Sequence, residues 1–298
     1  MAKSFHYGGQ AVLEGVMMRG EKHYAIAVRQ ETGRIATTVK GLSDMFGGKL
    51  RRIPLIRGIV VLIETLIIGT RALIYSADVA MGEEEIKGKS GLLWGSLVFG
   101  IVLAVGLFIA IPLLVTRFAI DPYISSSVIS NVVNGLVRLV IIIGYLWLIG
   151  YLPDIRRVFS YHGAEHKTIN AYENGVPLEL EQVKNYSTAH TRCGTSFLLI
   201  VLFLAIIIYI FIGRPVWYLR FAYQLALLPV IAAISYELLR ITARFSDSIV
   251  VRILTAPGLL IQRLTTREPD DDQLEVGIVS LKTVLDAESE DERGEPDV

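Results

Sequence analysis

Two histidines and a glutamate stand close together in the segment Tyr161-His-Gly-Ala-Glu-His-Lys167. His162 and His166 are four residues apart, so on a helix their imidazole rings project from one face, one turn apart, and can bind the same ion. Glu165 would lie on the neighbouring flank, where a carboxylate can act as a general base beside a metal without binding it. The segment therefore predicts a divalent metal site, with zinc as the expected ion.

A zinc site needs a third protein ligand, and four residues are candidates. Glu173 lies seven residues after His166, on the same face of a continuing helix, and Glu237 lies near the end of the last apolar segment. His190 and Cys193 form an H-x-x-C pattern, which suits a soft ion, and we favour this pair. With four protein ligands the site would be closed and structural, whereas three would leave a coordination position open for catalysis.

Three further features bear on the chemistry. The order H-x-x-E-H is that of the inverzincin proteases. Arg192 is expected to neutralise a developing oxyanion or a substrate phosphate, and Glu14 would join the site if the N-terminal segment folded over it. Gly8-Gly9-Gln10 matches the tripeptide with which peptide-chain release factors hydrolyse peptidyl-tRNA, but glycines that allow close backbone packing explain it better here.

The elements that must position these residues are mostly membrane helices. Of the 298 residues, 52% are hydrophobic, and the mean hydropathy is +0.51. Four apolar segments are long enough to cross a bilayer, namely residues 91–115, 128–152, 196–212 and 219–239. The 29 basic and 29 acidic side chains balance, so we expect no nucleic-acid partner. The single cysteine indicates a reducing compartment.

A fifth apolar segment, residues 54–80, carries four charged side chains at intervals of seven, Arg57, Glu64, Arg71 and Asp78. This spacing places them on one side of a helix. We predict that the helix is re-entrant or interfacial, with a charged stripe that pairs internally or faces water. The alternative is that Glu64 faces a polar cavity within the membrane.

The distribution of lysine and arginine predicts the orientation. Ten lie in the first 57 residues, two in 81–90, five in 153–195 and seven after residue 239, whereas the opposite side would hold only Arg117, Arg214 and Arg220. We therefore expect both termini and the 153–195 segment on the cytoplasmic face of a bacterial inner membrane.

The expected architecture is a polytopic α-helical membrane protein with about four transmembrane helices, one re-entrant or interfacial helix and a small cytoplasmic β-hairpin region. Residues 24–29 and 34–40 should be the hairpin strands, because they are β-branched runs around a turn. The expected regions are 1–50 with the hairpin, 51–85 with the amphipathic helix, 86–152 with the first transmembrane pair, 153–195 as the cytoplasmic loop with the metal site, 196–240 with the second pair, and 241–298 with a disordered acidic tail.

Four segments resemble, in order, the bacterial YqhQ-like family: residues 8–19, 161–167, 190–197 and 257–269. The similarity runs from about residue 5 to about residue 285. That family is a domain of unknown function, described as predicted metal-dependent enzymes of the membrane. The resemblance implies a metal at His162 and His166 and supplies no substrate.

We therefore expect a metal-dependent hydrolase at the cytoplasmic membrane face, with an amide or a lipid-linked phosphoester as compatible substrates. Its partners would be the lipid bilayer and an unknown protein or lipid-linked substrate. One alternative is a scaffold or assembly factor, in which a structural metal ties the 153–195 loop to the neighbouring spans. An ion or metal transporter is less favoured, because the first three spans contain no acidic residue.

Overall fold

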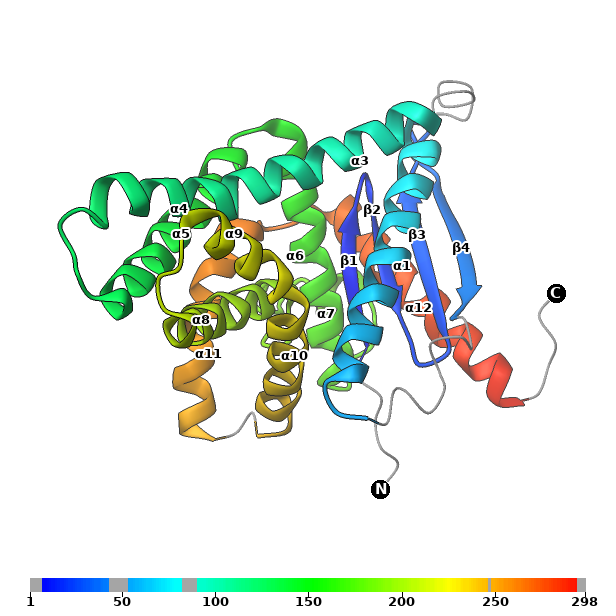
Figure 1. Cartoon of the computed structure of the whole chain (residues 1–298). Coiled ribbons are helices and arrows are strands. Elements are labelled where there is room, and N and C mark those ends of the chain that lie inside the picture. The colour runs from blue at the N-terminus through cyan, green and yellow to red at the C-terminus, as the bar shows by residue number, and fades with distance from the viewer. Residues whose placement is uncertain (1–6, 43–52, 82–89, 246–247, 294–298) are drawn as a thin grey trace.

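The computed structural model describes residues 7–42, 53–81, 90–245 and 248–293. Its elements form two parts, a four-stranded sheet with helices on both faces and a bundle of apolar helices (Figure 1). The predicted 153–195 loop is largely helical, with α6 (Pro153–Glu173) and the short α7 (Leu180–Val183). Because α6 packs on the sheet and follows a bundle helix directly in the chain, the histidine motif lies on the helix that joins the two parts.

The N-terminal residues form an antiparallel sheet in the order β1-β2-β3-β4. The strands are β1 (Gly8–Val12), β2 (Gly15–Arg19), β3 (His23–Arg29) and β4 (Ile35–Gly41). β3 and β4 are the hairpin expected from the sequence. The glycine-rich segment before them, for which we expected only close packing, forms a second hairpin with a two-residue turn at Leu13 and Glu14. Glycine is depleted in strands, and it concealed this hairpin.

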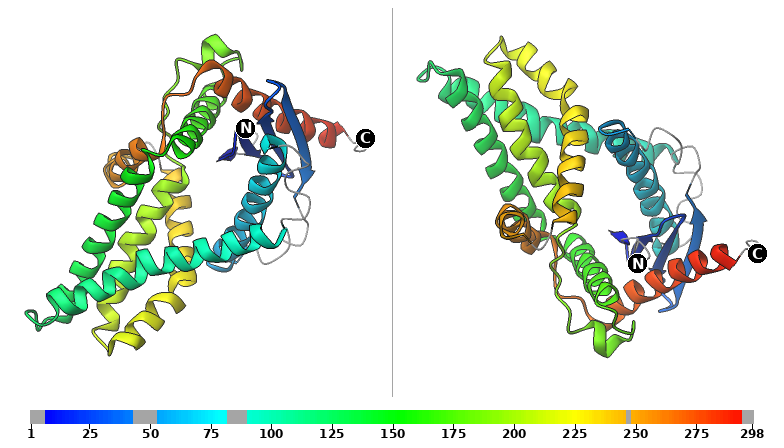
Figure 2. Two further views of the ribbon diagram at one scale, coloured as in Figure 1. Left: turned by 90° about the horizontal axis from the view of Figure 1, so that it is seen from above. Right: turned by 90° about the horizontal axis from the view of Figure 1, so that it is seen from below.

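Helices cover both faces of the sheet (Figures 1 and 2). α1 (Ile56–Met81) packs Ile68 and Ala72 against one face. α6 and α12 (Asp271–Arg293) cover the other face, in a core formed by Val16, Met18, Ala25, Ala27, Tyr161, Ile169, Val276, Leu281 and Val284. Successive strand residues point to opposite faces, so these few short strands supply apolar side chains to two cores.

The C-terminal segment forms a helix, whereas we predicted a disordered acidic tail. Asp270 and Gln273 form a reciprocal capping box, in which Gln273 N donates to Asp270 Oδ1 (2.8 Å) and Asp270 N donates to Gln273 Oε1 (3.1 Å). Beyond it, Leu274 and Leu281 are buried at helical spacing. The prediction was wrong as far as Arg293, because one face of this acidic helix is apolar and docks on the sheet; the acidic residues after it lie outside the described part of the chain.

Among the described residues, four helices are long and apolar enough to be membrane spans, and one bent helix pair could be a fifth; together they correspond to the five apolar segments found in the sequence. Three of these spans are single helices, namely Ile56–Ala80 in α1, Ser127–Ile149 in α5 and Gly194–Ile212 in α8. The span Gly95–Ile120 consists of four consecutive helical elements, α3 (Ser90–Val105), η3 (Gly106–Ala110), α4 (Ile111–Val115) and η4 (Thr116–Ile120). The fifth is broken, since α9 (Trp217–Ala226) and α10 (Leu228–Arg244) meet at 43°. Pro229 lies in the first turn of α10, where its missing N–H costs nothing. The chain is thus a multi-pass membrane protein.

α1 is held between the sheet and α10 (Figure 2). The buried Glu64 carboxylate accepts a hydrogen bond from Arg19 of β2 (2.6 Å), which favours an internally paired stripe over a Glu64 that faces a polar cavity. Near the start of α1, Arg57 pairs with Glu237 of α10. The exposed apolar side chains of α1 include Ile63, Leu66, Ile67, Leu73 and Ile74. A helix with one side on a sheet and another side apolar suits the membrane interface, and that placement stays a prediction.

Candidate metal centre

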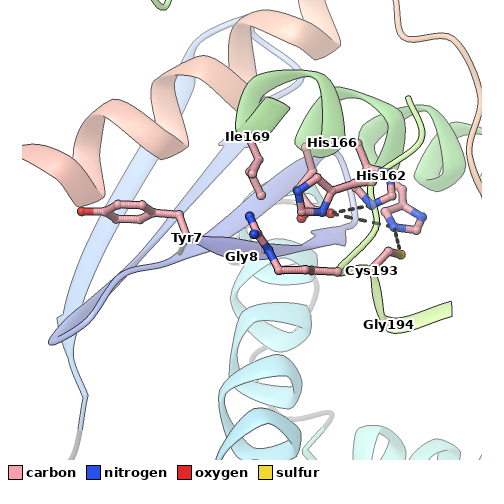
Figure 3. A pocket seen from close by; sticks show the side chains of 11 residues that line it. Tyr7, Gly8, His162, His166, Ile169, Cys193 and Gly194 are labelled. Carbon is pink, nitrogen blue, oxygen red and sulfur yellow. Dashed lines mark hydrogen bonds and ion pairs between the residues drawn. The ribbon is translucent and has the colours of Figure 1, made fainter. Parts of the chain in front are cut away.

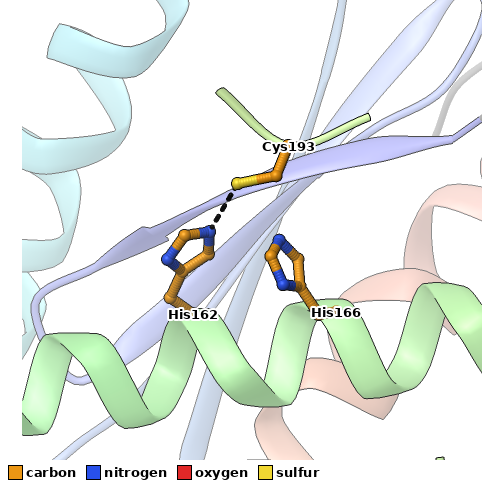
Figure 4. Close-up of side chains that lie close together, drawn as sticks. All are labelled: His162, His166 and Cys193. Atoms are coloured by element: carbon orange, nitrogen blue, oxygen red, sulfur yellow. Dashed lines mark hydrogen bonds between the residues drawn. The ribbon is translucent and has the colours of Figure 1, made fainter. Parts of the chain in front are cut away.

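The structure brings His162, His166 and Cys193 together (Figure 4). The two histidines project from one face of α6, as their spacing predicts, with ring centroids 4.4 Å apart. Cys193 is the N-cap residue of α8, and its Sγ lies 3.2 Å from His162 Nε2. One ligand atom from each residue lies within 4.8 Å of the other two, so the three residues can share an ion.

Backbone carbonyl groups fix both histidine rings. His162 Nδ1 lies 2.9 Å from the Thr265 carbonyl oxygen, and His166 Nδ1 lies 2.6 Å from that of Thr188. A carbonyl oxygen can only accept, so each Nδ1 carries a proton, and in the neutral ring Nε2 then keeps its lone pair. Metal-binding histidines are commonly oriented by such a bond from their second nitrogen. The tautomers therefore leave Nε2 of both rings available to an ion.

Glu165 lies beside this cluster without belonging to it. Its Oε2 is 3.8 Å from His162 Nε2 and 4.0 Å from His166 Nε2, and its side chain is only 6% exposed. Strand β1 packs directly over the carboxylate, because a Cβ on Gly9 would lie 2.8 Å from Glu165 Cγ. The glycine at this position permits that contact, in agreement with the expectation of close backbone packing.

Two of the predicted ligands, His190 and Glu173, lie outside the cluster. They contact each other, with His190 Nε2 at 3.4 Å from Glu173 Oε2, and Arg192 binds the same carboxylate. Glu173 is two helical turns beyond His166, about 10 Å along the axis, and its side chain turns to the loop before α8. Gln262 holds the His190 backbone, accepting from its N–H (3.0 Å) and donating to its carbonyl (2.7 Å). Burial lowers the pKa of the His190 side chain below its usual value.

The two other carboxylates considered from the sequence are bound elsewhere. Glu14 pairs with Arg157 and accepts a hydrogen bond from the Tyr161 hydroxyl (3.2 Å). The N-terminal segment thus does fold over α6, but the Glu14 carboxylate contacts the part of α6 that precedes His162. Glu237 pairs with Arg57. Neither residue is in the three-residue group that could hold an ion.

A cavity of about 110 Å³ opens at the cluster (Figure 3). α6 supplies one wall with His162, Glu165, His166 and Ile169, the loop before α8 supplies a second with His190, Arg192 and Cys193, and Tyr7, Gly8 and Gly9 supply a third. Six of the candidate site residues considered from the sequence line this cavity, whereas Glu173, Glu237 and Glu14 do not. The cavity brings a buried carboxylate, an arginine and three residues that could hold an ion into contact with one small volume.

The chain matches one family of known proteins over most of its length. The family described as "Protein of unknown function (DUF1385)" matches residues 53–287. The uncharacterized protein YqhQ of Bacillus subtilis (strain 168) is 35% identical over 305 residues, which cover 97% of this chain and 95% of that protein. The chain belongs to the DUF1385 family. No solved structure matches it, and the family description carries no activity, so the chemistry rests on the geometry of the site.

The region that matches the DUF1385 family contains all three cluster residues, but the sequence did not reveal what holds them in place. Thr188 and Thr265 act through their backbone carbonyl groups, which no side-chain pattern can indicate. Gln262 could have been found, because it is a lone amide in the apolar stretch of α11 (Ile249–Thr265) and is fully buried. A buried amide in such a helix usually has a specific hydrogen-bond partner.

Proposed function

We propose that this protein is a zinc-dependent hydrolase at the membrane surface, with His162, His166 and Cys193 as the metal ligands. The observation that carries the proposal is the buried Glu165 carboxylate, which lies 3.8 and 4.0 Å from the two Nε2 atoms and outside the ligand group. Two imidazoles and one thiolate suit zinc, and three protein ligands leave a coordination position open. The ion would supply Lewis acidity for a carbonyl or phosphoryl oxygen and would lower the pKa of water.

The other residues of the cavity have separate tasks. Glu165 takes the proton of the attacking water and delivers it to the leaving group. Arg192 lines the same cavity, and its ion pair with Glu173 holds the guanidinium there. Burial lowers the pKa of Arg192, but a guanidinium remains protonated at any pH at which the protein works. A fixed cation in this position stabilises negative charge as it develops on a substrate oxygen.

We propose that the site lies at the cytoplasmic membrane surface, and its neighbours in the chain support this position. α6 begins four residues after α5 ends, and Cys193 caps the start of α8, so the ligands stand at the ends of two candidate spans. The excess of lysine and arginine in the N-terminal region, in the 153–195 segment and in the C-terminal segment supports a cytoplasmic position. Both termini would then lie in the cytoplasm, at the inner membrane.

A structural metal site is the second candidate, because an ion between α6 and Cys193 would tie the N-terminus of α8 to the sheet part. In that case a fourth protein ligand would close the coordination sphere. Glu165 and His190 are the nearest groups able to do so, since both line the cavity. The protein would then act as a scaffold or assembly factor.

Metal analysis of the full-length protein, purified in detergent, tests whether the site binds a metal ion. We expect about one zinc ion per chain, as in other three-ligand zinc sites. His166→Ala should lose the ion and Glu165→Gln should keep it. Glu181→Gln is the matched control, because Glu181 is 84% exposed and pairs only with the neighbouring Lys184 among the described residues. A wild-type chain that retains less than about half an equivalent would contradict the metal site.

Replacing zinc by Co²⁺ distinguishes an open site from a closed one. Acetohydroxamate should change the absorption spectrum of the cobalt protein if a coordination position is free, and leave it unchanged if four protein ligands are bound. Cys193→Ser should remove the absorption that depends on the thiolate. A wild-type spectrum that does not respond to acetohydroxamate would establish the structural site and exclude the hydrolase.

A further inference from the structure

β1 is an edge strand, and its outer side is unpaired next to the metal ligands. The sheet order places β1 beside β2 alone. A two-residue turn joins the two strands, so Val12 and Gly15 form a hydrogen-bonded pair, and bonded and non-bonded pairs alternate from there. The N–H and C=O groups of Gly9 and Ala11 therefore point away from β2, towards the open side of the sheet.

This open edge is accessible at the cavity. Gly8 and Gly9 are both exposed, and both line the cavity together with His162 and His166 (Figure 3). Within the described residues, no backbone hydrogen bond from outside the sheet reaches the strand Gly8–Val12. Glycines leave the edge clear of side chains. An edge strand with unpaired N–H and C=O groups is a template for another extended chain.

The charges in the cavity favour a neutral substrate group over a phosphoester. Arg192 is the one arginine or lysine among the described residues that line the cavity, and it is already bound to Glu173. Glu165 adds a negative charge beside the metal ligands. The two charges of a zinc ion would be offset by the Cys193 thiolate and the Glu165 carboxylate. The loaded site would then have no excess positive charge to bind an anionic phosphoester, whereas a peptide bond is neutral and needs none.

Building on the proposed hydrolase, we propose that its substrate is a polypeptide segment that binds as an extended strand along the open edge of β1. The backbone groups of Gly9 and Ala11 hold this segment by strand addition, and the scissile carbonyl reaches the cavity beside the metal ligands. Gly9 has two tasks, because it offers its backbone to the substrate and leaves room for the Glu165 side chain below.

The reaction is the hydrolysis of an amide. The oxygen of water forms a bond to the carbonyl carbon, and the C–N bond breaks. Glu165 takes a proton from the water and passes it to the leaving nitrogen, which departs as an amine. The second proton of the water also ends on the amine, so the products are a carboxylate and a protonated amine, and no oxidant or reductant takes part.

The test uses the zinc-loaded, full-length protein in lipid nanodiscs and a synthetic library of linear peptides, with the products identified by mass spectrometry. A cleaved peptide is then resynthesised with one backbone N-methyl group at a time. We expect N-methylation to slow cleavage about tenfold at alternate positions, the equivalent of one lost hydrogen bond, and to have little effect between them, because strand pairing uses every second N–H group. Glu165→Gln should abolish cleavage, and Glu181→Gln should leave it unchanged.

The outcomes separate this inference from the proposed function. If N-methylation slows cleavage only at the scissile bond, or slows it equally at every position, the peptide does not dock on the strand edge. If the cobalt protein responds to acetohydroxamate but the zinc protein cleaves no peptide, the peptide assignment fails while the open metal site stands. If the cobalt spectrum does not respond and no peptide is cleaved, the hydrolase itself is wrong.

Discussion

The metal centre and the polar network inside the membrane bundle use similar groups in opposite arrangements. In the metal centre, one ligand atom from each of His162, His166 and Cys193 lies within 4.8 Å of the others. Each imidazole donates its only proton outwards, to a backbone carbonyl group. The atoms left to face one another are the two Nε2 acceptors and Cys193 Sγ, whose proton can be donated to His162 Nε2 (3.2 Å). A cation that replaces this proton could bind all three residues.

In the bundle, donors and acceptors meet one another. Arg138 in α5 donates to Gln224 Oε1 in α9 (2.8 Å), and Gln224 Nε2 donates to Asn134 Oδ1 (3.2 Å). Arg220 forms an ion pair with Asp121 (3.4 Å). Only the Nε atoms of Arg138 and Arg220 have no partner among the described residues of this network. The network joins the helices and requires no ligand.

The difference follows from the solvent around each region. Inside a bilayer no water can replace a missing hydrogen bond, so polar side chains persist there when they bind one another. In the cavity beside the candidate metal centre, water can hydrate the imidazoles and the carboxylate when no ion is bound. Convergent groups able to bind an ion can therefore persist there, while inside the bundle the polar groups act as contacts between helices.

The largest effect that tests this contrast is expected at Gln224. Gln224→Leu removes the acceptor of Arg138 and leaves a buried guanidinium without it, which should lower the free energy of unfolding by about 3 kcal/mol. The double variant Arg138→Leu/Gln224→Leu removes the charge as well and should recover most of that loss. Thermal and denaturant unfolding of the detergent-solubilised protein measure both.

The metal content serves as the internal control for this pair. If the two regions are independent, the Gln224→Leu protein binds as much zinc as the wild type, whereas His166→Ala loses zinc with a smaller loss of stability. A double variant that is no more stable than Gln224→Leu would mean that the charge of Arg138 is not what makes the single change costly.

The sequence was sufficient to predict the convergent part of the site. The spacing of His162 and His166 predicts two rings on one face of a helix, and of the predicted H-x-x-C pair the structure brings Cys193, but not His190, into one group with them. Glu173 obeys the same helical periodicity, but periodicity gives the direction of a side chain and not its distance along the axis. Two turns of helix separate it from His166, and its carboxylate pairs with Arg192 instead.

Other features depend on contacts between distant parts of the chain, which a single sequence does not encode locally. The five apolar segments could be found because membrane spans have a composition of their own. The position of β1 over Glu165 could not, since it depends on two glycines whose effect is to leave space. The helix α12 had a local signal in the capping box of Asp270 and Gln273, which its acidic composition concealed.

A second, smaller effect is expected at Gly163, which connects the fold to the metal centre. A Cβ at this position would lie 2.0 Å from the backbone oxygen of Arg267, so Gly163→Ala must push α6 away from the segment that carries the Thr265 carbonyl group. We expect a loss of about 2 kcal/mol in the free energy of unfolding, typical of overpacking. Because that carbonyl orients His162, zinc affinity should also fall about tenfold.

Gly144→Ala is the matched control for this change. Gly144 is also a helical glycine, but no heavy atom lies within 4 Å of the Cβ that alanine would add. Zinc titration and unfolding should show no loss for this variant, and alanine should stabilise the helix slightly. Equal losses of zinc affinity in both variants would show that the orientation of His162 by Thr265 is not what sets the affinity.

The smallest effect is expected at the pair of Lys22 and Asp291, which shows how little a polar contact contributes where water surrounds it. Their side chains are 60% and 41% exposed, and the hydrogen bond from Lys22 lowers the pKa of Asp291 below its ordinary value of 3.8. A carboxylate with a lowered pKa stabilises the folded state above the ordinary value and loses that contribution as the pH falls through the folded value. Asp291→Asn should therefore have a slightly lower melting temperature than the wild type at pH 7, and the two melting temperatures should converge below about pH 4.

Gln224→Leu should show the same loss of melting temperature at both pH values, because the guanidinium of Arg138 does not titrate in this range. A deficit of Asp291→Asn that persists in acid would mean that this contact does not act through its charge, and the distinction between the exposed pair and the buried network would fail.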